Sequence, residues 1–170
     1  VKGMKDPHHH LTLLVRNEKG YRNLLKLTSS SYKEGLYGKP RMDKEILAAH
    51  HEGLIALSGC PNSEFGQACR TDQMDKALKA ADDFKQIFGP ENFYLEVQNH
   101  GLDEEKKIFQ GSQQAARDLG LKIVATNNVH YMSRDDDKAH DAVLALAAGK
   151  LVSDPDRLRY PTPEFYLKSP

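Results

Sequence analysis

The chain has 170 residues, of which 39% are hydrophobic and 28% charged, and its 24 Lys and Arg balance its 24 Asp and Glu. It is long enough for one domain with a buried core, and the balanced charge excludes a polybasic nucleic-acid arm or an acidic tail. Two cysteines exclude a disulfide framework, and no signal peptide or apolar run of ~18 residues suggests export or membrane insertion, so we expect a cytoplasmic protein.

The first elements predicted along the chain are a strand and a long helix. After the triplet His8 to His10, the run LTLLV predicts a strand. Asn17 is a suitable N-cap for the following helix, in which leucines recur at helical spacing until Gly35. Lys39 to Arg41 then predict a loop.

A short helix, a second strand and a strongly amphipathic helix come next. The short helix is expected from Asp43 to His50, and the run LIALS within Gly53 to Gly59 predicts a strand with Cys60 at its tip. Residues Asp72 to Phe88 carry apolar side chains on one side of a helix, and Gly89 with Pro90 ends it.

Two further strands and two helices complete the pattern. FYLEV, from Phe93 to Val97, predicts a strand, and Asp103 to Leu119 predict a helix. The stretch KIVATNNVHY, from Lys122 to Tyr131, begins as a buried parallel strand and ends in polar residues. Ser133 is then expected to cap a helix that runs to Gly149.

Strands that alternate with helices predict an α/β fold with a parallel sheet or barrel. In such folds the carboxyl ends of the strands share one face, so Cys60, His100 and His130 are candidate neighbours. Thiolate and imidazole are preferred zinc ligands, which makes a metal site one hypothesis. The competing interpretations are a small buried cysteine after a strand and a histidine that bonds a backbone carbonyl.

Other polar clusters have simpler structural interpretations. Cys69 lies in a helical stretch and is expected in the core, and His50 with His51 suits a helix end. Asp135 to Asp137, near His140, are favourable charges at a helix N-terminus, although they also suggest a metal group. The sequence has no phosphate-binding glycine loop and no GxSxG motif, which argues against a nucleotide kinase or a serine hydrolase.

Six phrases of the sequence, in order, closely resemble the PHP (polymerase and histidinol phosphatase) domain at the N-terminal end of bacterial replicative DNA polymerase III alpha subunits. The resemblance covers residues 10–168. The phrases are HLTLLVRNEKGYRNLLKL, GLIALSGC, NFYLEVQNHGL, KIVATNNVHY, DDDKAHDAVLAL and SDPDRLRY.

The resemblance implies an α/β fold that is part of a distorted seven-stranded β/α barrel, with the N-terminal strands missing. Residues 1–170 would be a single PHP-domain segment of a longer polymerase chain, as Val1 in place of an initiator methionine also suggests. Residues 151–170 would begin the connection to the following polymerase region. The full-length subunit would be a DNA-directed DNA polymerase in the bacterial cytoplasm, and the segment alone would be inactive.

The resemblance also implies a metal site. Many members hold divalent ions, often zinc, with nine His, Asp, Glu and Cys residues, and support a 3′-5′ exonuclease or phosphoesterase activity. The matching ligands here are His10, Cys60 and His130, and the acidic member of the last motif falls on Asn128. His100 lies in a family phrase without being one of these ligands. Zinc or manganese is the expected ion, while magnesium would serve the polymerase part outside this chain.

Two departures from the family pattern bear on activity. The opening ligands have no counterpart, so five of the nine positions are absent. Asn128 offers an oxygen without charge, which weakens a cluster of divalent ions. Some members lack ligands and serve as a scaffold for a separate proofreading exonuclease subunit, so this role competes with the exonuclease.

The partners that the resemblance implies are DNA and deoxynucleoside triphosphates through the full-length subunit, together with the proofreading exonuclease and other replisome subunits, and no membrane. The alternative is a stand-alone PHP phosphoesterase of the histidinol-phosphatase type. The phrases SDPDRLRY and FYLKS, which resemble the polymerase type, argue against that alternative.

Overall fold

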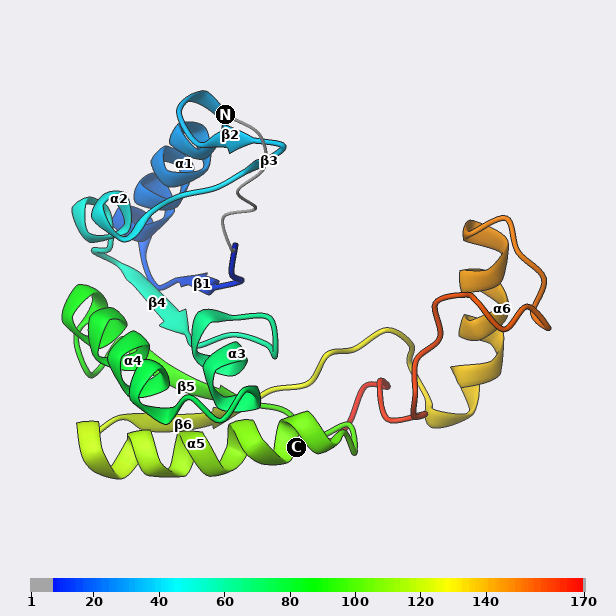
Figure 1. The fold of residues 1–170 in the computed structure, drawn as a ribbon. Coiled ribbons are helices and arrows are strands. Elements are labelled where there is room, and N and C mark those ends of the chain that lie inside the picture. Colours follow the sequence, from blue (N-terminus) through cyan, green and yellow to red (C-terminus); the bar gives the residue numbers. More distant parts are fainter. Residues whose placement is uncertain (1–7, 170) are drawn as a thin grey trace, which may run out of the picture.

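The computed structural model describes residues 8–169, so Val1 lies outside the described part of the chain. Figure 1 shows a body of strands and helices from which the C-terminal part, residues 126–169, extends as an arm. In chain order the elements are β1 (Thr12–Val15), α1 (Glu18–Lys33), β2 (Leu36–Tyr37), β3 (Lys39–Pro40), α2 (Lys44–Ala49), β4 (Leu54–Leu57), α3 (Glu64–Arg70), α4 (Met74–Phe88), β5 (Phe93–Val97), α5 (Asp103–Leu119), β6 (Lys122–Ala125), the 3₁₀ turn η1 (Arg134–Asp136) and α6 (Asp137–Ala147).

The main sheet has four strands in the order β1-β4-β5-β6. The strands β4, β5 and β6 are parallel, which confirms the predicted α/β fold and fits part of a β/α barrel. The prediction of a wholly parallel sheet is wrong, because β1 runs antiparallel to β4. The connection between these two strands contains two helices and the small hairpin β2-β3, and a connection of this length leaves the direction of the second strand free.

Local sequence signals account for the helices. Asn17 caps α1 by accepting a hydrogen bond from Gly20 N at 3.0 Å, and Asp43 caps α2 through Ile46 N at 2.9 Å, as predicted. The predicted amphipathic helix is α4, whose apolar side joins one core with the strands and with the other helices of the body. Its buried members include Ala81, Phe84 and Phe88. This core holds the strand tips in place.

Three local predictions need correction. Residues 39–41 were expected to form a loop, but Lys39 and Pro40 form β3, which pairs with β2 in a hairpin whose strands have two residues each. The strand β6 was expected to be buried, yet Ile123 is 39% exposed, because β6 is the last strand of the described sheet and one side of it has no cover. The last helix, expected to be capped by Ser133, begins at Asp137 after a 3₁₀ turn.

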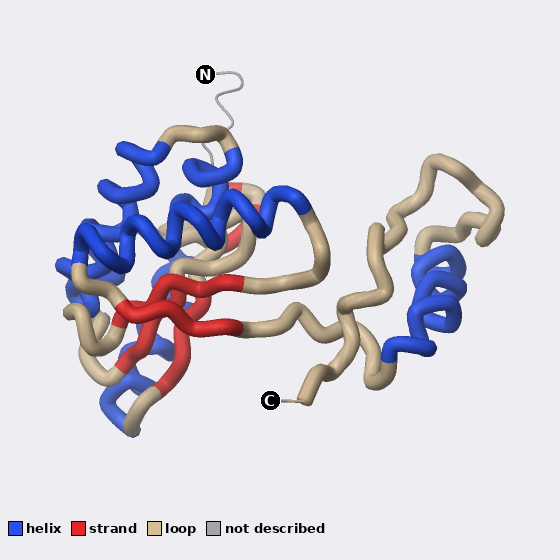
Figure 2. The backbone as a smooth tube through the Cα atoms, turned by 90° about the horizontal axis from the view of Figure 1, so that it is seen from below, coloured by secondary structure: helices blue, strands red, loops and turns tan. Residues whose placement is uncertain are grey.

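The C-terminal arm stands apart from the body in both Figure 1 and Figure 2, with α6 at its far end. The chain then returns, and the segment 165–167 lies beside 130–131. His130 N donates to Phe165 O at 2.8 Å, Leu167 N donates to Tyr131 O at 3.1 Å, and Tyr131 forms a parallel bridge with Tyr166. This return continues the strand pairing beyond the end of β6. Within residues 8–169, no helix is long and apolar enough to span a bilayer.

We predict that Gly20→Ala strongly destabilises the protein. A Cβ at Gly20 would overlap the backbone carbonyl of Gly53, where α1 meets the start of β4, and backbone cannot move aside without breaking the core. The expected loss is about 3 kcal/mol, measured by urea unfolding. Gly38→Ala is the control: nothing lies within 4 Å of its Cβ, and its positive φ of 71° costs only about 1–2 kcal/mol. Equal losses for the two variants would contradict the prediction.

Candidate functional site

The structure brings His10 and Cys60 together. His10 precedes β1 and Cys60 follows β4, and the antiparallel register, in which Thr12 faces Leu57, places these two chain segments side by side. The Cys60 Sγ lies 3.3 Å from His10 Nδ1, and His10 N donates to Asn62 O at 3.3 Å. Thus the antiparallel strand that was not foreseen is what creates the contact.

Gly59 permits this close approach. Its φ of +88° lies in the left-handed region, which any other residue would occupy only with strain. A Cβ here would also lie 3.0 Å from Ser63 Cβ and 3.1 Å from the His10 carbonyl oxygen. A glycine at this position therefore lets the turn after β4 pass next to the chain that enters β1.

The spacing of this pair suits two ligands of one metal ion. With ordinary zinc bond lengths and a tetrahedral angle, a bound sulfur and a bound nitrogen are about 3.6 Å apart. The 3.3 Å between Cys60 and His10 is close to that value, and both side chains are reachable from solvent. Within residues 8–169, however, no group of three His, Cys, Asp or Glu side chains is placed to hold a metal ion. The pair fits part of a site.

His130 lies in a different cluster, at the base of the arm. Its Nε2 is 2.8 Å from the Tyr160 hydroxyl, and its ring lies 5.7 Å from His140 and 6.0 Å from Phe165 between centroids. Desolvation, with smaller effects of His140 and His100, lowers the pKa of His130, while burial raises the pKa of the Tyr160 phenol. The predicted trio of His10, Cys60 and His130 is therefore split between two places.

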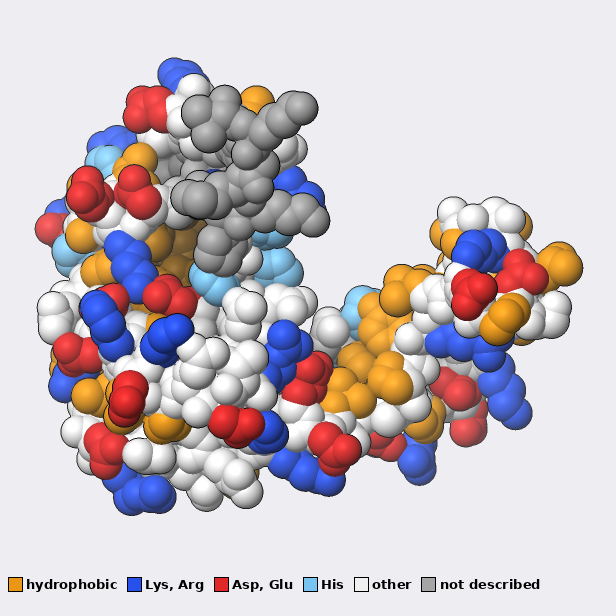
Figure 3. All heavy atoms as spheres, in the orientation of Figure 1, with side chains coloured by type: hydrophobic (Ala, Val, Ile, Leu, Met, Phe, Trp, Pro, Cys, Tyr) orange, Lys and Arg blue, Asp and Glu red, His pale blue; other side chains and the backbone are white. Residues whose placement is uncertain are grey.

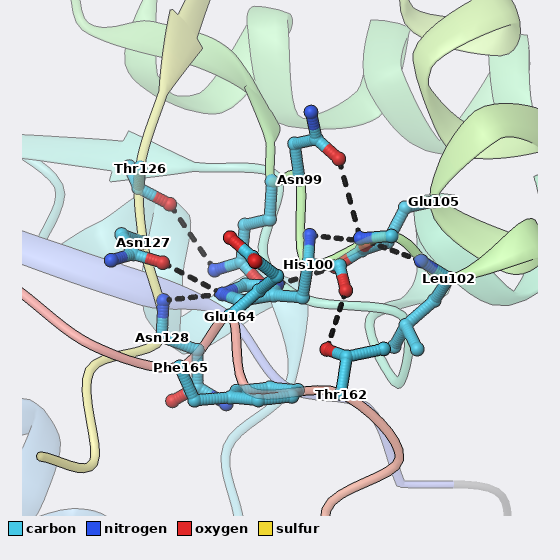
Figure 4. A network of polar contacts seen from close by, with 12 residues as sticks. Asn99, His100, Leu102, Glu105, Thr126, Asn127, Asn128, Thr162, Glu164 and Phe165 are labelled. Atoms are coloured by element: carbon cyan, nitrogen blue, oxygen red, sulfur yellow. Dashed lines mark hydrogen bonds and ion pairs between the residues drawn. The ribbon is translucent and has the colours of Figure 1, made fainter. Parts of the chain in front are cut away.

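Asn128 comes from the end of the β6 segment and is exposed. Its backbone N–H points to His100 Nε2 at 3.2 Å (Figure 4). The contact ties the chain after β6 to the tip of β5. Asn128 thus has a backbone role in this region, and its role as a ligand stays a prediction.

His100, at the tip of β5, is buried and has hydrogen-bond partners on both ring nitrogens and on its backbone. It is 1% exposed, and its Nδ1 lies 2.5 Å from Glu105 Oε1. Glu105 Oε2 accepts from the backbone of His100 at 2.7 Å and of Leu102 at 3.1 Å. Figure 4 shows this carboxylate at the centre of the network, reaching back from the first turn of α5.

The other edge of the His100 ring binds the segments that follow β6. Its Nε2 lies 2.7 Å from Asn127 Oδ1, and its face stacks on Phe165 at 4.3 Å between centroids and 7° between planes. The carbonyl of His100 accepts from Thr162 Oγ1 at 2.6 Å. This role of His100 was not predicted from the sequence. The available signal was Glu105 at the third position of a helix, from which a carboxylate reaches back to the backbone N–H of Leu102 at the helix start.

The remaining candidates have structural roles. Cys69 is buried against Gly111 of α5, where burial raises the pKa of its thiol to about 11, so the predicted core position is confirmed. His51 Nδ1 lies 2.7 Å from the Ala48 carbonyl oxygen at the end of α2. Asp136 accepts from the backbone and the hydroxyl of Ser133 and so caps the turn before α6.

Comparisons with known proteins identify the family. A family model described as "PHP domain" matches residues 1–100. The DNA polymerase III subunit alpha of Thermus aquaticus is 46% identical over 169 residues, which are 99% of this chain and 14% of that protein. The subunits from Saccharopolyspora erythraea and Treponema pallidum are 46% and 45% identical over 94% and 95% of the chain. The chain thus spans about one seventh of the length of these relatives, and the resemblance found in the sequence is confirmed.

We predict that Glu105→Gln destabilises the protein by about 2–4 kcal/mol, because an amide has one acceptor oxygen for three donors, two of them buried, and adds a donor of its own. Urea unfolding measures the loss. Glu104→Gln, in the same turn, removes a half-exposed ion pair with Arg70 and should cost less than about 1 kcal/mol. A smaller effect at Glu105 than at Glu104 would refute the importance of the network.

We also predict that His130 titrates below its ordinary value of 6.5, with the pKa rising in a His140→Gln variant. The folded pKa lies below the unfolded one, so the neutral ring favours the fold, and this stability is full above pH 6.5 and falls as the pH drops through the folded pKa. NMR titration of the imidazole carbons gives both midpoints. A His130 midpoint above 6.5 in the unaltered protein would contradict the prediction.

Proposed function

This chain belongs to the PHP domain family, in the form found in DNA polymerase III alpha subunits, and we propose from that premise that it contributes a divalent-metal site to a replicative polymerase. The full-length subunit would extend DNA from deoxynucleoside triphosphates in the bacterial cytoplasm, with magnesium at polymerase residues outside this chain. Residues 151–170 would lead into that polymerase region. The similarity of this chain to the alpha subunits, over nearly the whole length of the chain, supports this proposal against a stand-alone phosphoesterase.

The observation that carries the metal proposal is the contact of 3.3 Å between Cys60 Sγ and His10 Nδ1. Two residues 50 positions apart in sequence, both of preferred zinc-ligand types, meet at the carboxyl end of β4 with a spacing that fits adjacent ligands. A cysteine with a purely structural role would be buried like Cys69, whereas Cys60 is partly exposed. Zinc or manganese is the proposed ion.

The proposed reaction is hydrolysis of a phosphodiester, as in a 3′-5′ exonuclease. A divalent ion at such a site supplies a Lewis acid for a phosphate oxygen and a bound water of lowered pKa. In this chain, His10 and Cys60 would hold the ion, and Gly59 would keep them in register. His130 and Asn128 would join from the segment after β6.

A second candidate function is favoured by Asn128. It stands where the family pattern has an acid, and within residues 8–169 no three donor side chains form a group that could hold a metal ion. Both observations suit a segment that serves as a scaffold. The partner would then be the proofreading exonuclease subunit, and the surface that binds it would retain its affinity after the metal ligands are removed.

We predict that the full-length protein carrying this chain contains stoichiometric zinc or manganese, measured by elemental analysis. The double variant His10→Ala, Cys60→Ala should lose this metal and any metal-dependent release of nucleotides from 3′-labelled single-stranded DNA, because it removes two donors at once. The matched control is His51→Gln with Cys69→Ala, which alters the same residue types at structural positions.

Two outcomes would contradict the metal proposal. One is an absence of bound metal in the unaltered protein, and the other is equal metal content in the double variant and the control. In either case the scaffold hypothesis is tested by measuring, with purified components and gel filtration, whether the proofreading exonuclease subunit binds. Undiminished binding in the double variant would support it, and no binding at micromolar concentrations would refute it.

A further inference from the structure

A small cavity lies at the tips of β4 and β5. Its wall holds the side chains of Cys60, Glu96, Gln98 and Glu105, together with Gly59, Pro61 and Ile108. It offers about 10 Å³ to the centre of a water-sized sphere. This is close to the space that one buried water molecule needs, and the wall offers polar partners for it.

One carboxylate oxygen of Glu96, a residue that lines this cavity, has no hydrogen-bond partner among the described residues. The Glu96 side chain is 6% exposed, and the oxygen without a partner is Oε2. A buried carboxylate oxygen without a donor is costly, so such an atom normally faces a water or an ion. Glu96 lines a cavity with room for one water molecule, and such a water could donate the hydrogen bond that Oε2 lacks.

The other carboxylate oxygen of Glu96 is fixed. Its Oε1 accepts from Thr126 Oγ1 at 2.5 Å and from Gln98 Nε2 at 3.3 Å, and its backbone N donates to Ser58 Oγ at 2.8 Å. These contacts come from β5 and from the ends of β4 and β6. The position of Oε2 is therefore set by three neighbouring strands, as expected of a group that positions something else.

We propose that Glu96 is a positioning carboxylate of the metal site that contains Cys60, acting through one water molecule held in the cavity that both residues line. The proposal deepens the metal-site function and rests on it. The water would donate one hydrogen bond to Glu96 Oε2 and would also lie near Cys60, which lines the same cavity. Glu96 would thereby help to orient Cys60 and would add a negative charge near the bound cation.

An indirect role fits the structure better than direct ligation. Glu96 forms no three-donor group with the other His, Cys, Asp or Glu side chains of residues 8–169. A carboxylate one water away still lowers the energy of a nearby cation, and such outer partners are worth about 10–100-fold in metal affinity. The role also compensates in part for Asn128, which brings no charge where an acid is expected.

The test is the zinc affinity of the full-length protein, measured by competition with a chromogenic chelator. Glu96→Gln keeps the shape of the side chain and an acceptor for Thr126, but removes the charge. We expect its zinc affinity to fall about tenfold, while the melting temperature of the metal-free protein stays near that of the unaltered protein. Glu96→Asp, which keeps the charge, should retain most of the affinity.

The control is Ser112→Ala. Ser112 is also fully buried with a hydroxyl that has no hydrogen-bond partner among the described residues, but it does not line this cavity. Its zinc affinity should not change. An affinity of Glu96→Gln within twofold of the unaltered protein would overturn the proposal, as would a high-resolution crystal structure of the zinc-loaded protein without a water in the cavity.

The outcomes also separate this proposal from the function on which it rests. If the unaltered protein binds no zinc or manganese, the metal-site function fails and Glu96 loses its role with it. If the unaltered protein binds metal and Glu96→Gln binds it equally well, only the role of Glu96 fails. Should Glu96→Gln not fold, the crystal structure and Glu96→Asp still decide.

Discussion

The carboxylate of Glu105 links the start of α5 to the tip of β5 and, through His100, to the segments after β6. It accepts hydrogen bonds from the backbone N–H groups of His100 and Leu102 and lies 2.5 Å from the His100 ring nitrogen, and the two contacts with His100 are buried. One side chain thus fixes the start of α5, the tip of β5 and the orientation of an imidazole. Through that imidazole it also fixes Asn127 and Phe165, which lie after β6 and on the returning arm. Burial of this charge is tolerated because each oxygen is satisfied by donors.

Much of the fold could be predicted because its signals are local. The caps at Asn17 and Asp43 and the apolar side of α4 depend on residues a few positions apart, and the structure has each of them. The direction of β1 could not be predicted, because its connection to β4 contains two helices and a hairpin and is long enough for either direction. The exposure of β6 was missed because an apolar run does not reveal whether a further strand or helix will cover it.

The site was predictable in part. The pattern of a strand followed by a cysteine placed Cys60 at a tip, and the resemblance supplied His10, but only the antiparallel register explains why they meet. Glu96 was not singled out, and His100 was named only as a possible metal neighbour, because the contacts that matter for each residue are with partners distant in sequence, Thr126 for Glu96 and Asn127 for His100. The glutamate in FYLEV becomes unusual only once the strand is known to lie in the middle of the sheet, where a charged side chain is buried.

The arm would limit how His130 could join the proposed metal site at His10 and Cys60. Apolar side chains gather along it in Figure 3, and Leu146 of α6 is 80% exposed, so the arm has surface that this chain does not cover. His130 sits at its base, bonded to the Tyr160 hydroxyl. An imidazole can bind a metal ion through one ring nitrogen while the other stays hydrogen-bonded, so the Tyr160 contact does not by itself prevent His130 from serving as a ligand. In the proposed metal site, the position of the arm would therefore decide whether His130 could reach an ion at Cys60.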